Sequence, residues 1–506
     1  MLRKNSHRGS VAVPSLDDVH RSVSTDHPSF FRRLFAFAGP AFLVSVGYMD
    51  PGNWATDIAG GSQYGYSLLW VLVMSNGMAL FLQTLAARMG IVGGRDLAQA
   101  CRDLYPKPIR IALWILCELA IAACDLAEVI GTMIGLHLLC KIPFLWGLVI
   151  TVLDTFFLLA IQRFGIRAME AFILSLVFMI GLCFGFELLF ANPVWSDVFA
   201  GIIPTMMSKA PFVFTDTGAL YIAIGILGAT VMPHNLYLHS ALVQSRAVQK
   251  TEEGMAMACR YNFIDSFVAL NAAFFVNAAI LILAGAAFSS HGVVVAGIEE
   301  AHRLLPHFLG EEFAATLFAI ALLCSGQSST LTGTLAGQIV MEGFLSFRMQ
   351  PWLRRLLTRS IAIIPAAITI LFFGESRLQD LLVLSQVILS LQLPFAIIPL
   401  LRYTNDPARM GRFRSTLWMR CAGALIAVVI LSLNAYLVVA QVQSWRVLLP
   451  SLGYSVLWID VLVIPACILV VALVLYLIAE QFFYTKIQRG ADQTSQTVLA
   501  SFAALP

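Results

Sequence analysis

Twelve apolar stretches that are long enough to cross a lipid bilayer dominate this sequence. A helix spanning the hydrocarbon core needs about 20 predominantly apolar residues. The stretches centre near residues 36–62, 66–90, 110–139, 143–161, 170–191, 217–244, 263–288, 313–345, 358–373, 379–401, 418–441 and 457–481. Because lipid offers no hydrogen bonds to an open backbone, stretches of this length are expected to be helical. We therefore predict an all-α membrane protein with about twelve transmembrane helices.

The composition favours one membrane-embedded bundle. Hydrophobic residues make up 59% of the chain and charged residues 12%, whereas a soluble domain has about 25% charged residues. The polar N-terminal tail, residues 1–34, lacks the apolar core of a cleavable signal, and residues 483–506 form a second polar tail. The net charge of +3 gives no reason to expect nucleic-acid binding. Nothing in these features calls for a bound cofactor or an obligatory protein partner.

Lysine and arginine are distributed unequally between the two sets of loops. If the N-terminus is inside, the outer loops hold 5 of the 32 basic residues, namely Lys141, Lys209, Arg303, Arg377 and Arg446. The other 27 lie in the tails and in the opposite loops or helix ends. By the positive-inside rule, we expect a multi-pass protein of the plasma (inner) membrane with both termini in the cytoplasm.

The first and sixth spans are interrupted by proline and polar residues. Residues 47–53 read Gly-Tyr-Met-Asp-Pro-Gly-Asn, and residues 228–235 read Gly-Ala-Thr-Val-Met-Pro-His-Asn. Proline removes a backbone donor and opposes helix continuation. A break in hydrocarbon leaves backbone groups unpaired, and Asp50 adds an ionisable group at the same depth, which indicates a functional site. We expect helices one and six to be unwound in the middle.

The two breaks occupy matching positions if the chain contains two five-helix repeats. Interrupted helices at corresponding positions indicate a transporter site between inverted repeats. We predict a ten-helix transport core over residues 35–402, followed by two additional transmembrane helices over residues 403–482. A single proline kink is usually structural, and a buried methionine is usually filler. The combination of Asp, Asn, Met and His at two matching breaks favours a site.

The residues at the breaks suit a divalent transition-metal ion. Asp50 offers a carboxylate, Asn53 offers an amide oxygen, and the freed carbonyls of Gly47 and Ala229 add two neutral oxygens. Met232 adds a thioether, a soft ligand that oxygen-only sites for Mg²⁺ or Ca²⁺ do not use. Such a site would accept Mn²⁺, Fe²⁺, Co²⁺ and Cd²⁺ and disfavour Ca²⁺ and Mg²⁺. With only one carboxylate around a 2+ ion, the occupied site keeps a net positive charge. This suits a transport site, which must release its ion.

Three motifs resemble those of the Nramp family of proton-coupled divalent metal transporters, and most of all its bacterial manganese-transporter branch. They are residues 50–53, residues 232–234 and the run 326–338 in span eight, and the resemblance covers roughly residues 35–445. It implies a leucine-transporter-like 5+5 inverted repeat, with the metal between the unwound segments. The ligands it implies are Gly47, Asp50, Asn53, Ala229 and Met232, joined in some conformations by Gln386. Many family members have alanine at the position of Gly47, and Asn235 receives no role.

A proton route is predicted along span three. Glu118, Asp125 and Glu128 share one helix face at 100° per residue. Carboxylates in hydrocarbon are costly unless they are paired or protonated, so structural ion pairing is the alternative interpretation. Arg354 and Arg355, near the inner end of span nine, are natural partners, and the resemblance implies a proton pathway of such carboxylates and arginines.

Two histidines follow the break in span six. His234 lies two residues after Met232 and could titrate near neutral pH. We expect Asp50 to accept a proton and to pass it to Asp125 and Glu128, with His234 tuning the exchange. A histidine that merely satisfies the helix break is the alternative. His239 has the weaker claim to a role in proton transfer.

We predict import of divalent transition-metal ions together with protons, by alternating access. The ions are substrate and coupling ion, not cofactors, and the residues do not rank Mn²⁺ over Fe²⁺. A Na⁺-coupled organic-solute transporter on the same fold stays open, although it would favour small hydroxyl residues at the breaks. A metal receptor that does not transport also stays open. An intramembrane metalloprotease is not expected, because the sequence has no H-E-x-x-H motif.

Overall fold

The computed structural model describes residues 20–480 except 27–28, 163, 204–215, 296, 311, 348, 452–454, 456 and 458. Residues 1–19 of the predicted N-terminal tail and the predicted C-terminal tail lie outside this part of the chain. Within it, strands are limited to β1 (Val23–Ser24) and β2 (Arg246–Ala247), which pair in parallel. The predicted all-α class is confirmed apart from this two-residue pairing.

The predicted apolar stretches coincide with helices. Those of the first half are α2 (Pro40–Ser45), η2 (Val46–Met49), α3 (Pro51–Tyr64), η3 (Gly65–Leu68), α4 (Leu69–Gly93), α6 (Lys107–Cys140), α7 (Phe144–Gln162) and α8 (Ile166–Ala191). Those of the second half are α10 (Thr217–Val231), α11 (Pro233–Leu242), α12 (Glu252–Ala287), α14 (Glu312–Leu345), α15 (Pro351–Ile368), η7 (Thr369–Phe373) and α16 (Leu378–Asn405). Beyond them come α18 (Leu417–Ser451) and a last helical segment, Ile459–Glu480, which begins with η10 (Ile459–Val463).

Short elements connect these helices. They are α1 (Phe30–Phe37), α5 (Leu97–Leu104), α9 (Trp195–Gly201), η5 (Val243–Ser245), η6 (Ser289–His291), α13 (Ile298–Leu309), η8 (Glu375–Arg377), α17 (Pro407–Met410) and η9 (Gly411–Phe413).

The number of spans differs slightly from the predicted twelve. Ten helical segments in the described residues are long and apolar enough to cross a membrane, and an eleventh results if α6 and α7 together form one span. These two helices meet at a bend of 117° around residues 141–143. The prediction of twelve counted them as two spans, and it is therefore not confirmed in full.

Both predicted breaks are present, and proline stands at the start of a new half-helix in each. η2 ends at Met49, and α3 begins at Pro51. α10 ends at Val231, and α11 begins at Pro233. Proline is tolerated at the first helical position because the N–H it lacks has no helical partner there. Each break thus directs the carbonyl end of one half-helix and the amide end of the next into the bundle.

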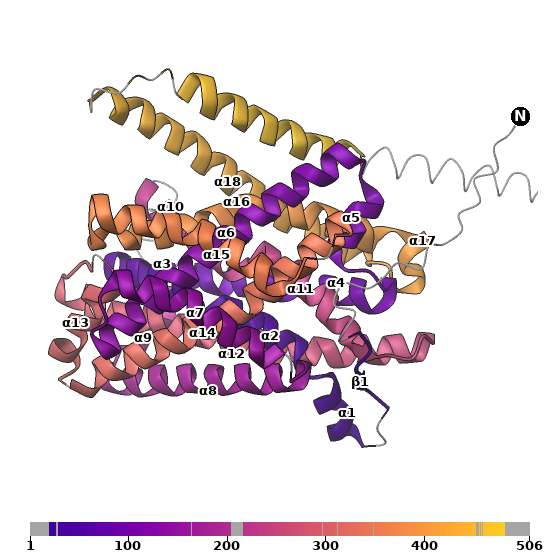
Figure 1. Cartoon of the computed structure of the whole chain (residues 1–506), viewed down its shortest axis with the longest axis horizontal. Coiled ribbons are helices and arrows are strands. Elements are labelled where there is room, and N and C mark those ends of the chain that lie inside the picture. Colours follow the sequence, from indigo (N-terminus) through magenta and orange to yellow (C-terminus); the bar gives the residue numbers. More distant parts are fainter. Residues whose placement is uncertain are drawn as a thin grey trace, which may run out of the picture.

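The broken helices lie in the interior of the bundle. Within the segment Thr217–Ser245, 94% of the apolar window is buried, against 22% for Leu417–Val447 and 11% for Ile459–Glu480. α10 packs on α16 and α3, and α3 also packs on α12. The last two segments, yellow in Figure 1, run along one side of the bundle, where α18 contacts α16 and α10. The boundaries proposed for the ten-helix core and its two added helices stay predictions.

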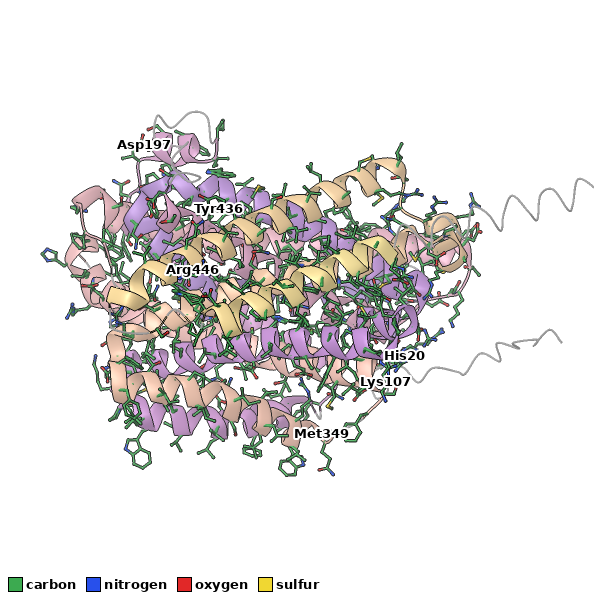
Figure 2. The ribbon with its side chains drawn as sticks, turned by 90° about the horizontal axis from the view of Figure 1, so that it is seen from above. His20, Lys107, Asp197, Met349, Tyr436 and Arg446 are labelled. Atoms are coloured by element: carbon green, nitrogen blue, oxygen red, sulfur yellow. The ribbon has the colours of Figure 1, made fainter. Side chains whose placement is uncertain are left out.

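Two of the connecting loops can be placed at the ends of the bundle. Figure 2 places His20 and Lys107 toward one end and Asp197 near the opposite end. Lys107 belongs to the loop predicted to be cytoplasmic, and Asp197 belongs to a loop predicted to lie outside. These two loops therefore lie toward different ends of the bundle, and the assignment of either end to the cytoplasm stays a prediction.

Candidate metal-transport site

Three oxygens from the two breaks converge on the side-chain amide of Asn53. Its Nδ2 atom lies 2.7 Å from Asp50 Oδ1 and 3.3 Å from each of the carbonyl oxygens of Gly47 and Ala229. Asp50 also caps α3, because its Oδ1 accepts the backbone N–H of Asn53 at 2.8 Å. Ala229 lies in the last turn of α10, where carbonyls lack helical partners, and the Gly47 carbonyl in η2 also accepts the Asp50 backbone N–H at 3.4 Å. Four predicted ligand residues from distant segments thus form one buried cluster.

The thioether of Met232 lies close to Gly47. Met232 is fully buried in an apolar cluster between α6 and α16. A Cβ added to Gly47 would lie 3.2 Å from the Met232 sulfur. The side-chain nitrogen of Asn235 approaches the same sulfur at 3.6 Å and donates to the Val44 carbonyl at 3.3 Å. Asn235, to which the sequence assigned no role, therefore helps to orient the predicted sulfur ligand.

Gln386 of α16 approaches the cluster over Gly52. The side chain is fully buried, and a Cβ added to Gly52 would come 1.6 Å from Gln386 Nε2. Glycine is therefore required for this close approach. Gln386 also interacts with the Asp50 carboxylate, while its own Oε1 has no hydrogen-bond partner among the described residues.

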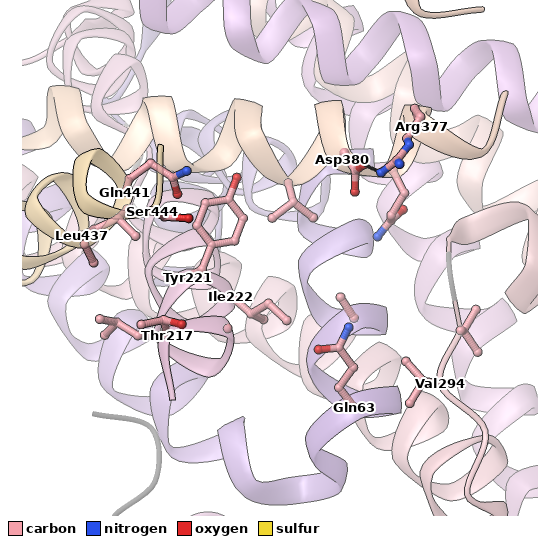
Figure 3. Close-up of a pocket in the computed structure, with 17 residues that line it drawn as sticks. Gln63, Thr217, Tyr221, Ile222, Val294, Arg377, Asp380, Leu437, Gln441 and Ser444 are labelled. Atoms are coloured by element: carbon pink, nitrogen blue, oxygen red, sulfur yellow. Dashed lines mark hydrogen bonds and ion pairs between the residues drawn. The ribbon is translucent and has the colours of Figure 1, made fainter. Parts of the chain in front are cut away.

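A pocket of about 910 Å³ lies between α3, α10, α16 and α18. Polar side chains from α3, α10 and α18 line it, and Arg377 and Asp380 form an ion pair of 3.0 Å at one side (Figure 3). Gln379, which also lines the pocket, donates to the Ala55 carbonyl at 2.9 Å, two residues beyond Asn53. Because Arg377 belongs to a loop predicted to be outside, the pocket opens toward the predicted outer face.

A hydrogen-bonded network packs against the cluster on the side of α11. Gln83 Nε2 donates to the Tyr48 hydroxyl at 2.9 Å, and Gln83 Oε1 lies 3.0 Å from His239 Nδ1. Asn262 Nδ2 lies 3.5 Å from His239 Nε2. Since the Gln83 oxygen only accepts and the Asn262 amide nitrogen only donates, His239 is neutral with its proton on Nδ1. Both ring nitrogens of His239 have hydrogen-bond partners. This agrees with the smaller role in proton transfer that the sequence predicted for it.

The thiol of Cys124 lies between Asp50, one of the predicted metal ligands, and the carboxylate of Glu128 on α6. Its sulfur is 3.9 Å from Asp50 Oδ2 and 3.7 Å from Glu128 Oε1. Asp125 and Glu128 are fully buried. His234 is 2% exposed, interacts electrostatically with Asp125, and has no hydrogen-bond partner at Nδ1 among the described residues. Of the predicted proton-route residues, Glu128 is thus linked to Asp50 through Cys124.

The arginine partners of these carboxylates differ in part from the prediction. Arg354 binds Glu118 at 3.0 Å, as expected. Glu128 is paired with Arg359 at 3.3 Å, and Arg359 also lies 3.6 Å from Asp154 of α7. The side chain of Arg355 lies outside the described part of the chain.

Arg359 and Asp154 were therefore not among the residues predicted for the proton route. Arg359 is 1% exposed and lies more than one helical turn deeper in span nine than Arg354. A single arginine within the apolar run of that span, and a single aspartate within span four, were the available signals.

The chain is similar to known proteins along most of its length. The family described as natural resistance-associated macrophage protein-like (Nramp) matches residues 41–440. The chain belongs to the Nramp family. A divalent metal cation transporter of Nostoc sp. is 53% identical over 440 residues, covering 87% of this chain and 98% of that protein. A transporter of the same name from Agrobacterium fabrum is 53% identical over 425 residues, covering 84% of this chain and 91% of that protein.

Solved structures agree with this membership. A crystal structure of the Eremococcus coleocola manganese transporter has a TM-score of 0.84 and 39% sequence identity, covering 93% of this chain and all of that one. The inward-facing structure of Mhp1, a nucleobase-cation symporter, has a TM-score of 0.51 at 14% identity, covering 83% of this chain and 90% of that one, and so shares the fold alone. The predicted leucine-transporter-like fold and the prediction of a transporter rather than an enzyme are confirmed.

The third sequence motif of this Nramp protein is a stripe of glycines on α14. A Cβ added to Gly326 would come 2.4 Å from Thr132 Oγ1, and one added to Gly333 would come 2.8 Å from Glu128 Oε1. At Gly337 it would come 1.8 Å from the Arg354 guanidinium. The spacings of seven and four residues place all three glycines on one helix face. The motif therefore lets α14 approach the charged groups of α6 and α15.

Replacing Gly337 with alanine is expected to push Arg354 away from Glu118. The added methyl group overpacks a buried contact, which typically costs about 1–3 kcal/mol. Thermal unfolding of the purified protein in detergent measures the loss. Gly181→Ala on α8 is the matched control, since no atom lies within 4 Å of its added Cβ. Equal unfolding temperatures for the two variants would contradict this explanation of the motif.

Proposed function

We propose that this Nramp protein imports divalent transition-metal ions, Mn²⁺ first, together with protons. The single observation that carries the proposal is the convergence of the Gly47, Asp50 and Ala229 oxygens at Asn53, with the Met232 sulfur beside them. One carboxylate, neutral oxygens and a thioether form a mixed set that Mn²⁺, Fe²⁺, Co²⁺ and Cd²⁺ accept and that Ca²⁺ and Mg²⁺ do not favour. The names of the relatives, divalent metal cation transporter and manganese transporter, support the same substrate class.

The metal enters from the pocket bordered by Arg377 and Asp380 and binds between the two breaks. Both termini are cytoplasmic and the protein resides in the plasma membrane, as the basic loops indicate. A membrane potential that is negative inside then favours entry by about 2.3 kcal/mol per positive charge and 100 mV. The ion is transported substrate, and neither a resident cofactor nor a second protein is needed for this cycle.

Protons leave the metal site along α6. Asp50 accepts a proton when no metal is bound, and Glu128 is the next carboxylate, with the Cys124 thiol between the two. The ion pairs Glu128–Arg359 and Glu118–Arg354 continue from there toward the predicted inner end of α15. Asp125 and His234 lie beside the first step and tune it. This arrangement supports transfer of protons and metal by separate routes from one shared carboxylate.

Replacing Met232 with leucine is expected to remove the preference for transition metals while uptake continues. Leucine keeps nearly the same volume but lacks the sulfur, and such exchanges are usually tolerated in a core. We expect the ratio of Mn²⁺ to Ca²⁺ uptake to fall about tenfold, which corresponds to about 1.4 kcal/mol. Proteoliposomes with internal metal and pH indicators, under a negative-inside potential, measure both ions and the accompanying acidification.

The same experiment distinguishes metal import from the alternative functions, a metal receptor and an organic-solute carrier. Met133→Leu is the matched control, because Met133 is also fully buried but lies on α6 outside the cluster. Mn²⁺ uptake with internal acidification in the wild type and an altered ratio in Met232→Leu alone support the proposal. No Mn²⁺ uptake by the wild type would favour a receptor or an organic-solute carrier. Equal ratios in both variants would remove Met232 from the site.

A further inference from the structure

The amide of Asn53 is held by a second asparagine, Asn277 of α12. Asn277 is 1% exposed, and its Nδ2 donates to the Tyr48 carbonyl at 2.7 Å and to Asn53 Oδ1 at 3.2 Å. Its own Oδ1 has no hydrogen-bond partner among the described residues. All hydrogen bonding of this buried side chain therefore passes through its nitrogen.

The chemistry of these groups fixes both amides. A backbone carbonyl only accepts hydrogen bonds, so the Asn277 atom nearest to Tyr48 has to be the nitrogen. The second hydrogen of that nitrogen points at Asn53, which has to present its oxygen there. Asn53 consequently presents its NH₂ group to the oxygens of Gly47, Asp50 and Ala229.

This orientation of Asn53 opposes metal binding. An NH₂ group has no lone pair for a cation, and here its hydrogens engage the oxygens that would coordinate the metal. Coordination by Asn53 requires its amide to turn by about half a revolution, so that Oδ1 joins the other oxygens. The turned NH₂ group would then face the NH₂ group of Asn277. If Asn277 turned as well, its oxygen would face the Tyr48 carbonyl.

We propose that Asn277 is a positioning residue that holds the Asn53 amide in the orientation that excludes metal. It thereby lowers the affinity for metal and makes metal binding depend on the conformation of the protein. This inference rests on the proposed function, since it concerns the affinity of the same site. Tyr48 belongs to η2, so the hydrogen bonds that fix the Asn277 and Asn53 amides depend on the position of this half-helix. Movement of η2 away from α12 withdraws the carbonyl, frees Asn277 to turn, and lets it accept from the turned Asn53. Half-helix movement and metal coordination are coupled through one pair of amides.

The proposal predicts that loss of Asn277 strengthens metal binding. In Asn277→Ala the Asn53 amide turns without opposing another NH₂ group. We expect the Kd for Mn²⁺, measured by titration calorimetry on the purified full-length protein, to fall about fivefold, equivalent to about 1 kcal/mol. Asn277→Leu, which fills more of the same space, is a second variant with the same expected direction. Asn271→Leu is the matched control, since Asn271 lies on the same helix and bonds to Asn76 rather than to the cluster.

A double-mutant cycle tests whether Asn277 acts through Asn53. In an Asn53→Ala background, Asn277→Ala is expected to leave the Kd for Mn²⁺ unchanged, because no amide remains to be positioned. A merely structural role for Asn277 would instead weaken binding in both backgrounds.

The outcomes distinguish the inference from the proposed function. A wild-type protein that does not bind Mn²⁺ overturns both. A wild-type protein that binds Mn²⁺, together with Asn277 variants whose Kd is unchanged or higher, overturns the inference alone. A lower Kd in both Asn277 variants that disappears in the Asn53→Ala background supports it.

Discussion

Mn²⁺ uptake by Asp50→Asn is expected to fall at least about 100-fold below that of the wild type. Asp50 supplies the only charged group of the predicted ligand set. Leaving a buried charge without its partner typically costs about 3–5 kcal/mol, and about 2.7 kcal/mol already corresponds to a factor of 100. The replacement keeps the local fold, because asparagine caps a helix as well as aspartate does. Its Oδ1 can still accept the Asn53 backbone N–H, which Asp50 now accepts at 2.8 Å.

The same substitution also tests the proton route. Without the Asp50 carboxylate, no proton acceptor remains at the start of the path to Glu128, so metal-dependent acidification of proteoliposomes is expected to disappear as well. Glu187→Gln is the matched control. It also removes a fully buried carboxylate of the membrane interior, on α8, and neither of its oxygens has a hydrogen-bond partner in the described part of the chain. Near-normal Mn²⁺ uptake by Asp50→Asn would rule out this carboxylate as the central ligand.

The meeting of the two breaks could be predicted because the sequence places incompatible groups in a membrane. Proline and aspartate at residues 50–51 cannot continue a helix in lipid without compensation, and residues 232–234 repeat the pattern in span six. Two such breaks in one bundle had to share their unpaired backbone groups. The Asn53 side chain, 3.3 Å from the Ala229 carbonyl across 176 residues of sequence, is the result.

The residues that orient the ligands could not be predicted in the same way. Asn235 and Asn277 carry no local signal, because a single asparagine in an apolar helix is compatible with many contacts. The Val44 carbonyl is brought to Asn235 only by the packing of α11 against α2, and the Tyr48 carbonyl is brought to Asn277 only by the packing of α12 against η2. Helical periodicity gives the face of a residue on its own helix but not the neighbour that this face meets.

The arginine partners show the same limit. Arg359 lies five residues from Arg354 and therefore about 140° round the helix and one turn deeper. It reaches Glu128 and Asp154, whereas Arg354 reaches Glu118. The carboxylates could be identified from α6 alone, but their pairing required the position of α15.

Replacing Arg359 with methionine is expected to cause the largest loss of stability among these variants. Arg359 is 1% exposed and binds Glu128, Asp154, the Thr151 carbonyl at 3.2 Å and the Thr330 hydroxyl at 3.3 Å. Methionine keeps much of the volume but leaves the buried Glu128 carboxylate and the partly buried Asp154 carboxylate without this cation. Removing one partner of a buried ion pair typically costs about 3–5 kcal/mol. Thermal inactivation of the purified protein at a fixed temperature measures the effect as a rate.

The reason for the loss can be separated from simple repacking. Adding Glu128→Gln and Asp154→Asn to Arg359→Met removes both uncompensated charges, so much of the stability is expected to return, since a neutral replacement of a whole buried ion group is often tolerated. Arg377→Met is the surface control, because Arg377 and Asp380 are each 67% exposed and such pairs contribute at most about 1 kcal/mol. A triple variant as unstable as Arg359→Met would show that Arg359 acts through packing. If the triple variant is stable, transports Mn²⁺ and no longer acidifies the vesicles, the ion network serves proton transfer more than folding.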